Sequence, residues 1–246
     1  NAWQVVDQLG PQGSSSTGEG LSPSMAVSGD MLFVAAGDAD ERWGAHVFQR
    51  NARRAWRRVQ SLSLVGDLAG PSAQWNYAAL MEILEPPRRV TDADGDHALV
   101  AAIGGLGDVR AFAQDLDTGL WTERARFERS EPEADDGFGA SLMVRGDAAI
   151  VGAPRHERSG AVYVFSRDPA TGEWTEDALI PAPSPFPNSE FGAAVAIDGG
   201  ALLIGHPGTA ESRGIVVEYT WDEVRRAWTQ QDRIAPGVRT VGDRFG

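Results

Sequence analysis

The sequence predicts an all-β fold built from a repeated four-stranded unit, and three observations predict it. Tryptophans recur at a regular spacing, tight glycine-containing turns recur in phase with them, and a short apolar run follows each turn. Such periodicity is typical of repeat architectures, in which each unit buries its apolar face against its neighbours. The 29 glycines and 14 prolines among 246 residues also suit many short strands joined by turns.

The tryptophans set the register of the repeat. Five of them stand in similar local sequence, at spacings of 53, 65, 53 and 54 residues: Trp3, Trp56, Trp121, Trp174 and Trp228. An aromatic residue that ends a short β-type run precedes each of the last four: Phe48, Phe112, Phe165 and Tyr219. We therefore expect one strand to end at the aromatic residue and the next to begin at the tryptophan.

A two-residue turn marks the first half of each unit. The turns are Gly29-Asp30, Gly95-Asp96, Gly146-Asp147 and Gly199-Gly200. Glycine accepts a positive φ, so these pairs predict tight hairpins between a strand A and a strand B. Strands C and D complete a four-stranded antiparallel unit, and a period of about 50 residues is that of a β-propeller blade. A β-solenoid and a pair of sandwiches are the alternatives.

We expect a single β-propeller domain or fragment with four complete blades and a partial blade at each end. Since both ends stop within a blade, we expect the natural domain to be larger, with closure as four or five blades as the alternative. An incomplete ring would expose unpaired surfaces and self-associate. The predicted divisions are residues 1–12, 13–64, 65–131, 132–184, 185–237 and 238–246.

The second period is the longest. The segment 73–84 has a helical composition and is followed by Pro86-Pro87, which a helix does not easily pass. This pattern predicts one short helical insertion near residues 73–84, in the loop that joins strand D of one blade to strand A of the next.

Two of the repeats resemble a known family. The segments FGASLMVRGDAAIVGAPRHERSGAVYVF (138–165) and FGAAVAIDGGALLIGHPGTAESRGIVVEY (191–219) are similar to bacterial-type FG-GAP repeats, the units of integrin-alpha-like β-propellers. Phe138-Gly139 and Phe191-Gly192 supply the Phe-Gly pair, and Gly152-Ala153-Pro154 supplies Gly-Ala-Pro. The resemblance implies a secreted, cell-surface or periplasmic location and a role in adhesion or ligand binding. It leaves the ligand open, because function resides in sites rather than in folds.

Charge and composition narrow the classes of partner. The formal net charge of −13 repels phosphate backbones, so we expect no nucleic-acid partner. No apolar run is long enough for a membrane span, and the absence of cysteine excludes disulfides and thiolate metal sites.

The sequence predicts no catalytic residues, no metal site and no cofactor. Calcium is the alternative, since Asp92, Asp94 and Asp96 approach the spacing of an acidic calcium loop, but Gly95-Asp96 is better interpreted as the strand A to strand B turn. The four histidines show no paired spacing, and no GxSxG or phosphate-binding loop occurs. The acidic cluster Glu131, Glu133, Asp135 and Asp136 is interpreted as a solvated loop.

The candidate ligand-binding residues lie on the strand B to C loops and the strand D to A loops, which leave a propeller on the same face. Aromatic and arginine side chains supply most of the binding energy at interfaces. The candidates are Trp43, Trp75, Arg155, His156, Arg158 and Arg213. For Trp43 and Trp75, packing between blades and anchoring of the insertion are the alternatives.

The predicted function is an extracellular or cell-surface scaffold, not an enzyme, that binds a protein or carbohydrate ligand through this loop face. A propeller-based hydrolase or polysaccharide lyase is one alternative. A purely structural spacer in a larger surface protein is the other.

Overall fold

The computed structural model describes residues 20–28, 30–37, 43–52, 55–63, 81–83, 97–102, 107–115, 117–198, 200–237 and 240–246. In these residues the chain is all-β, with a 3-10 turn at His156–Arg158 and a helix, α1, at Thr209–Ser212. No helix in this part of the chain is long and apolar enough to cross a bilayer.

The strands form four antiparallel sheets of four strands each, and in every sheet the strands pair in chain order. Sheet 1 contains β1 (Gly20–Ser28), β2 (Met31–Gly37), β3 (Trp43–Arg50) and β4 (Trp56–Ser63). Sheet 2 contains β5 (Met81–Ile83), β6 (His97–Ala102), β7 (Asp108–Gln114) and β8 (Trp121–Arg126). Sheet 3 contains β9 (Ser141–Arg145), β10 (Ala148–Ala153), β11 (Ala161–Arg167) and β12 (Trp174–Pro181). Sheet 4 contains β13 (Val195–Asp198), β14 (Ala201–His206), β15 (Ile215–Asp222) and β16 (Ala227–Ile234).

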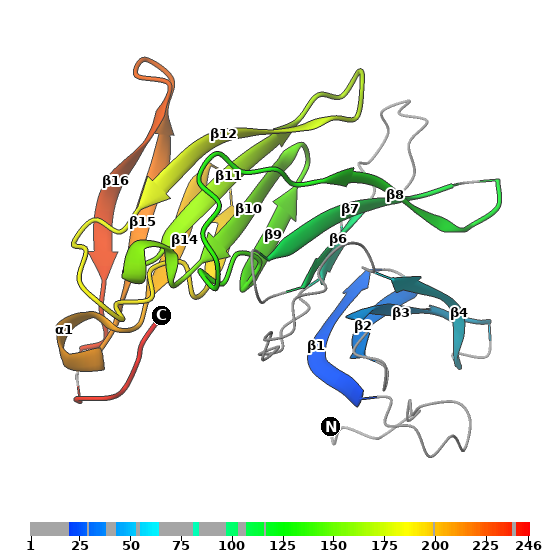
Figure 1. The fold of residues 1–246 in the computed structure, drawn as a ribbon, viewed down its shortest axis with the longest axis horizontal. Helices are drawn as coiled ribbons and strands as arrows, with labels where there is room; N and C mark the ends of the chain where they lie inside the picture. The colour runs from blue at the N-terminus through cyan, green and yellow to red at the C-terminus, as the bar shows by residue number, and fades with distance from the viewer. Residues whose placement is uncertain are drawn as a thin grey trace.

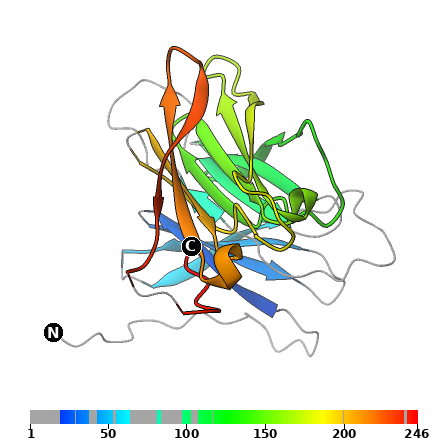
Figure 2. The ribbon, with the colours of Figure 1, turned by 90° about the vertical axis from the view of Figure 1, so that its left-hand side faces the viewer.

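The four sheets follow one another along an arc, from the blue first sheet to the orange and red fourth sheet (Figure 1). The first strand of each sheet contacts the first strand of the next, so β1, β5, β9 and β13 line the inner side of the arc. From the side of the fourth sheet, the β15–β16 hairpin lies in front of the third sheet (Figure 2). The fold is therefore propeller-like, with sheets stacked in sequence order.

The tryptophan register predicts the strands correctly. Trp56, Trp121 and Trp174 are the first residues of β4, β8 and β12, the last strand of their sheets. The turns 146–147 and 199–200 join the first two strands of sheets 3 and 4, as the glycine pairs predict.

The predicted helix at 73–84 is wrong for residues 81–83, which form β5 and pair with β6. Pairing with a neighbouring strand overrides the helical preference of this short segment. Residues 73–80 lie outside the described part of the chain. The extra length of the second period falls between β5 and β6, which are joined by residues 84–96, whereas two residues join the first two strands of every other sheet.

The Gly-Asp turns hold the end of the third strand. Asp147 accepts hydrogen bonds from Arg167 at the end of β11, with the Nε to Oδ1 distance 2.9 Å, and the Arg167 amide donates to the Asp147 carbonyl. Asp30 and Arg50 repeat this arrangement in sheet 1, at 2.8 Å. The aspartate in the turn between the first two strands therefore also fixes the position at which the third strand ends.

The sheets interlock through the Phe-Gly pairs. Phe191 is fully buried between sheets 3 and 4, and Gly192 donates from its amide to the Gly205 carbonyl of its own sheet, at 2.9 Å. The Gly192 carbonyl lies against Gly152 of the preceding sheet and accepts a hydrogen bond from the Ser141 hydroxyl, at 2.8 Å. A Cβ atom at Gly152 would overlap this carbonyl oxygen.

A second glycine receives the same segment. Gly160 precedes β11 with φ +94° and forms a parallel bridge with Phe191, and the Phe191 amide donates to the Ser159 carbonyl at 2.9 Å. Gly214 and Phe245 repeat the bridge on sheet 4. The backbone of each Phe-Gly pair therefore fits into a space that is open only because the residue facing it in the preceding sheet is glycine. We call this arrangement the clamp.

We predict that Gly160→Ala lowers the free energy of unfolding by at least about 3 kcal/mol, because the added Cβ overlaps the Phe191 backbone as well as straining φ. Gly200→Ala is the matched control. Its φ of +90° is nearly the same, but no atom lies within 4 Å of the added Cβ. This control should cost only about 1 kcal/mol. Denaturant titration of both variants measures the two free energies of unfolding. Equal losses of free energy in the two variants would refute the steric role given to Gly160.

Candidate functional site

Two loops at one end of sheet 3 bring charged side chains together around His156. The loop between β8 and β9 supplies Arg129, Glu131, Glu133 and Asp136, and the loop between β10 and β11 supplies His156. These are a strand D to A loop and a strand B to C loop, which the sequence places on one face. The contact between His156 and the acidic residues of the other loop was not predicted.

A buried ion pair forms the base of the site. Arg129 Nη1 lies 2.7 Å from Asp136 Oδ2, and both side chains are buried. The Arg129 guanidinium also covers the Phe138 ring, with its Cζ 4.2 Å from the ring centroid. Asp136 Oδ1 accepts a hydrogen bond from the Phe138 amide at 2.9 Å. The Phe-Gly pair that locks the sheets together therefore also fixes this carboxylate.

His156 lies above this pair and is only 5% exposed. Its Nδ1 is 3.7 Å from Asp136 Oδ2 and 3.7 Å from Glu133 Oε2, and its Nε2 is 3.8 Å from Glu131 Oε2. Nδ1 is buried and makes no hydrogen bond in the structure. The side chains of Glu131, beside Nε2, and Glu133, beside Nδ1, are 61% and 49% exposed, so the carboxylates around the buried ring reach solvent.

The loops around the imidazole are held in conformations that few residues adopt. Asp135, Glu157 and Arg158 have φ values of 59°, 46° and 64°, in the left-handed region. Glu133 accepts a hydrogen bond from the Glu157 amide at 2.8 Å, and Arg155 donates from Nε to the Asp135 carbonyl at 2.8 Å. A non-glycine residue in the left-handed region is strained and persists only where the surrounding structure holds it in place. Such residues cluster at functional sites.

Tyr163 closes the inner side of the site. Its hydroxyl donates to the Glu131 carbonyl at 2.8 Å, and its ring centroid lies 5.9 Å from that of His156. Burial raises the pKa of Tyr163, so it stays a neutral hydrogen-bond donor. This side of the imidazole is apolar, and the opposite side carries the carboxylates.

The interpretation of the acidic cluster as a solvated loop is right for Glu131, Glu133 and Asp135, which are exposed, and wrong for Asp136, which is buried against Arg129. A buried carboxylate requires a charged partner. The presence of an arginine, Arg129, in the same loop as Asp136 was the one sequence feature that pointed to a buried ion pair. In the described residues, no group of three His, Cys, Asp or Glu side chains has the geometry to hold a metal ion. Asp92, Asp94 and Asp96 lie outside those residues, so the prediction on calcium stays a prediction.

The predicted binding residues are only partly brought together. Arg155, His156 and Arg158 share one loop, with both arginines exposed. Arg213 is half-buried before β15, in another sheet. Trp43 begins β3, with its side chain outside the described part of the structure, and Trp75 lies wholly outside it.

Comparison with known proteins supports the repeat. Residues 121–165 match the family model of the FG-GAP repeat. The predicted resemblance is thereby confirmed over β8 to β11, the segment that contains Phe138-Gly139 and Gly152. No curated protein sequence matches the chain.

Solved structures of similar fold include an enzyme. A protein from Lactobacillus plantarum matches 88% of this chain, with 57% of its own chain covered, 14% identity and a TM-score of 0.60. The periplasmic gluconolactonase PpgL of Pseudomonas aeruginosa matches 88% of this chain, with 55% of its own chain covered, 18% identity and a TM-score of 0.54. The chain spans a little over half the length of these proteins, and at this identity the likeness concerns the fold alone.

The prediction of an adhesion or binding scaffold without enzymatic activity is corrected by this comparison. A propeller-like fold similar to this one belongs to a gluconolactonase. Such a fold therefore does not by itself indicate a scaffold without enzymatic activity.

His206 is a second buried histidine, at the place of the alanine in Gly-Ala-Pro. It is fully buried against Phe191 and Phe186, with ring centroids 5.2 Å and 6.3 Å from its own, and neither ring nitrogen makes a hydrogen bond in the structure. Burial, and then the positive charge of Arg233, lower the pKa of His206 to about 4. It is therefore a neutral packing residue.

We predict that His206 makes stability fall as pH is lowered from about 6.5 to about 4. In that window the unfolded chain binds a proton at this residue and the folded chain does not, so protonation favours unfolding, by up to about 3 kcal/mol at the acid end. His206→Ala should lose packing at pH 7 but show a flatter decline. Urea titrations of the wild-type and His206→Ala proteins between pH 4 and pH 6.5 test this prediction. Parallel declines of their free energies of unfolding with falling pH would contradict it.

Proposed function

We propose that the four sheets are consecutive blades of a β-propeller and that the protein is a hydrolase whose active site surrounds His156. The observation that carries the proposal is a buried imidazole within 4 Å of three carboxylates, where the loop that joins sheets 2 and 3 meets the β10–β11 loop. Histidine is the commonest general acid and base, because its ordinary pKa lies close to neutrality.

The two ring nitrogens suit different roles. Nδ1 faces the buried Asp136, which can orient the ring and stabilise its protonated form, as the carboxylate does in other acid–base pairs. Arg129 holds Asp136 in place and balances its charge. Nε2 lies beside the exposed Glu131, and in this proposal substrate and water approach the ring from that side. Distances of 3.7–3.8 Å are long for hydrogen bonds, as is common in sites without substrate.

A small cyclic ester is the substrate class that best fits this arrangement. Neutral His156 removes a proton from water through Nε2, and the water oxygen forms a bond with the ester carbonyl carbon. The carbon–oxygen bond of the ring then breaks, and the proton passes from His156 to the leaving alkoxide, which gives a hydroxy acid. The fold shared with a gluconolactonase supports this class. Arg155 and Arg158 are exposed on the same loop as His156, and in this proposal they supply positive charge for the developing negative charge. A secreted, cell-surface or periplasmic location stays a prediction.

We predict that His156→Gln lowers kcat/KM for lactone hydrolysis at least about 100-fold, because it removes the general base. Proton release in a pH-stat, with gluconolactone and a panel of γ- and δ-lactones, measures the rate above the uncatalysed background. Circular dichroism and thermal melting establish that the variant is folded.

His46→Gln is the matched control. His46 lies in sheet 1, where its Nδ1 bonds to the Ser61 hydroxyl at 2.9 Å, away from the loops of sheet 3. This variant should keep kcat/KM within about twofold of the wild-type value. The proposal fails if the wild-type protein hydrolyses none of the panel above background, or if both variants are equally active.

A further inference from the structure

Neighbouring sheets are joined differently at equivalent positions of the repeat. Gln60 of β4 clamps the backbone of Trp121 in the next sheet. Its Nε2 donates to the Trp121 carbonyl at 2.7 Å, and its Oε1 accepts from the Trp121 amide at 2.8 Å. Trp121 is 2% exposed and meets Phe33 edge-on, with ring centroids 4.8 Å apart. The junction between sheets 1 and 2 is therefore sealed at this point.

Alanine replaces this glutamine at the next junction. Gln60 pairs with Val47 next to a bulge in β3–β4, and Ala125 pairs with Ala111 next to the same bulge in β7–β8. The two residues are thus equivalent in register. Trp174, the counterpart of Trp121, packs on Phe127 with ring centroids 5.2 Å apart but stays partly exposed. A methyl group cannot reach its backbone.

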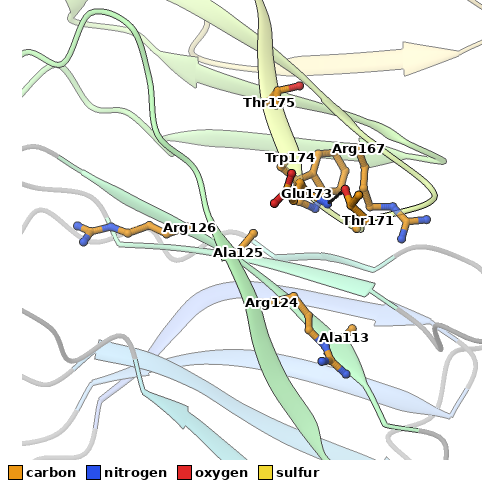
Figure 3. A pocket seen from close by; sticks show the side chains of 10 residues that line it. Ala113, Arg124, Ala125, Arg126, Arg167, Thr171, Glu173, Trp174 and Thr175 are labelled. Atoms are coloured by element: carbon orange, nitrogen blue, oxygen red, sulfur yellow. Dashed lines mark hydrogen bonds between the residues drawn. The ribbon is translucent and has the colours of Figure 1, made fainter.

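An open groove of about 550 Å³ lies at this junction, between β8 and the turn that joins β11 to β12. Ala125 forms part of its wall, together with Trp174 and the adjoining turn residues Thr171 and Glu173 (Figure 3). This volume is in the range of pockets that hold small molecules. We call this space, between sheets 2 and 3, the Arg124 groove.

Arginines gather in the lining of this groove, in a protein whose net charge is −13. Three arginines line it, Arg124, Arg126 and Arg167, against one acidic residue, Glu173. Arg126 pairs with the buried Asp108, with Nε 2.9 Å from Oδ1, and extends away from the others in Figure 3. Arg124 and Arg167 extend to the same side in that view.

Acidic neighbours outside the groove offset part of this charge. Asp147 forms an ion pair with Arg167, whose side chain is only 9% exposed, and accepts from both its Nε and its Nη2. Asp115 lies near Arg124, and its pKa is lowered mainly by hydrogen bonds from Thr118 and less by the charge of Arg124. The exposed Arg124 is therefore the lining residue best placed to meet a ligand charge.

We infer that the Arg124 groove binds a small organic anion, a sugar-sized molecule that carries a carboxylate or a phosphate. The guanidinium group of Arg124 binds the anionic group, as an arginine fork does. The exposed part of Trp174 contacts the body of the molecule, and the hydroxyls of Thr171 and Thr175 lie within reach of its polar groups. The groove is distinct from the loops around His156, so this inference does not depend on the hydrolase activity.

Isothermal titration calorimetry of the purified protein tests the inference with gluconate, glucose 6-phosphate, inorganic phosphate and glucose as probes. We expect at least one sugar anion to bind below about 10 mM and at least about tenfold more tightly than neutral glucose. Comparison of gluconate with the two phosphates identifies which anionic group is preferred. Equal binding of glucose, or no binding by any probe, would overturn the inference.

Ala125→Gln is the decisive variant, because it fills the groove without changing its charge. The new side chain should bond to the Trp174 backbone as Gln60 bonds to that of Trp121, and should abolish anion binding. The protein should remain folded, with a melting temperature no lower than that of the wild type because of the new hydrogen bonds.

Arg124→Ala should weaken binding of the anionic probe at least about tenfold. Arg225→Ala is the matched control, since Arg225 is exposed on the turn between β15 and β16 of sheet 4 and its loss changes the net charge equally. It should leave the affinity unchanged. Equal weakening by the two arginine variants would indicate non-specific attraction, and full binding by Ala125→Gln would place the ligand elsewhere. Either result overturns the inference.

Discussion

The fold depends on the insertion of each Phe-Gly segment into the sheet that precedes it. The Gly192 carbonyl lies against Gly152, and the Phe191 backbone lies against Gly160, at distances that leave no room for a Cβ atom. The same peptide bonds to its own sheet through the Gly192 amide and the Gly205 carbonyl. One dipeptide is thus shared by two sheets, which fixes their separation and lets Phe191 fill the core between them.

This junction also explains where the charged site lies. Phe138 is buried by the same insertion between sheets 2 and 3, and its ring carries the guanidinium of Arg129 on the outer side. Its amide binds Asp136. The ion pair beneath His156 therefore rests on the part of the repeat that is least free to move. The carboxylates of Glu131 and Glu133 extend beyond it into solvent, where residues can change without loss of packing.

The regular part of this architecture could be predicted from the sequence, because the tryptophans, the turn glycines and the Phe-Gly pairs each have one structural role per repeat. Strand order follows directly from the predicted hairpins. The position of β5 could not be predicted, since Met81–Ile83 gains its extended form from pairing with β6 rather than from its own preferences. His156 was among the predicted ligand-binding residues, but its carboxylate neighbours were missed for a related reason. A single histidine and a distant acidic loop show no local spacing, and only the stacking of strands brings them within 4 Å.

Differences between copies of the repeat indicate function better than the shared landmarks do. The landmarks are explained by packing, as with Gly152 and Trp121, so they say nothing about chemistry. The departures have no such explanation. Ala125 leaves uncovered a backbone that Gln60 covers one sheet earlier, and arginines gather where it does so. His156 and Asp136 likewise add an imidazole and a buried carboxylate that the packing of the clamp does not require. In a fold whose sheets act as internal controls for one another, an unfilled junction and a buried ion pair beside an imidazole are the features that packing leaves unexplained, and these are where binding and catalysis should be sought.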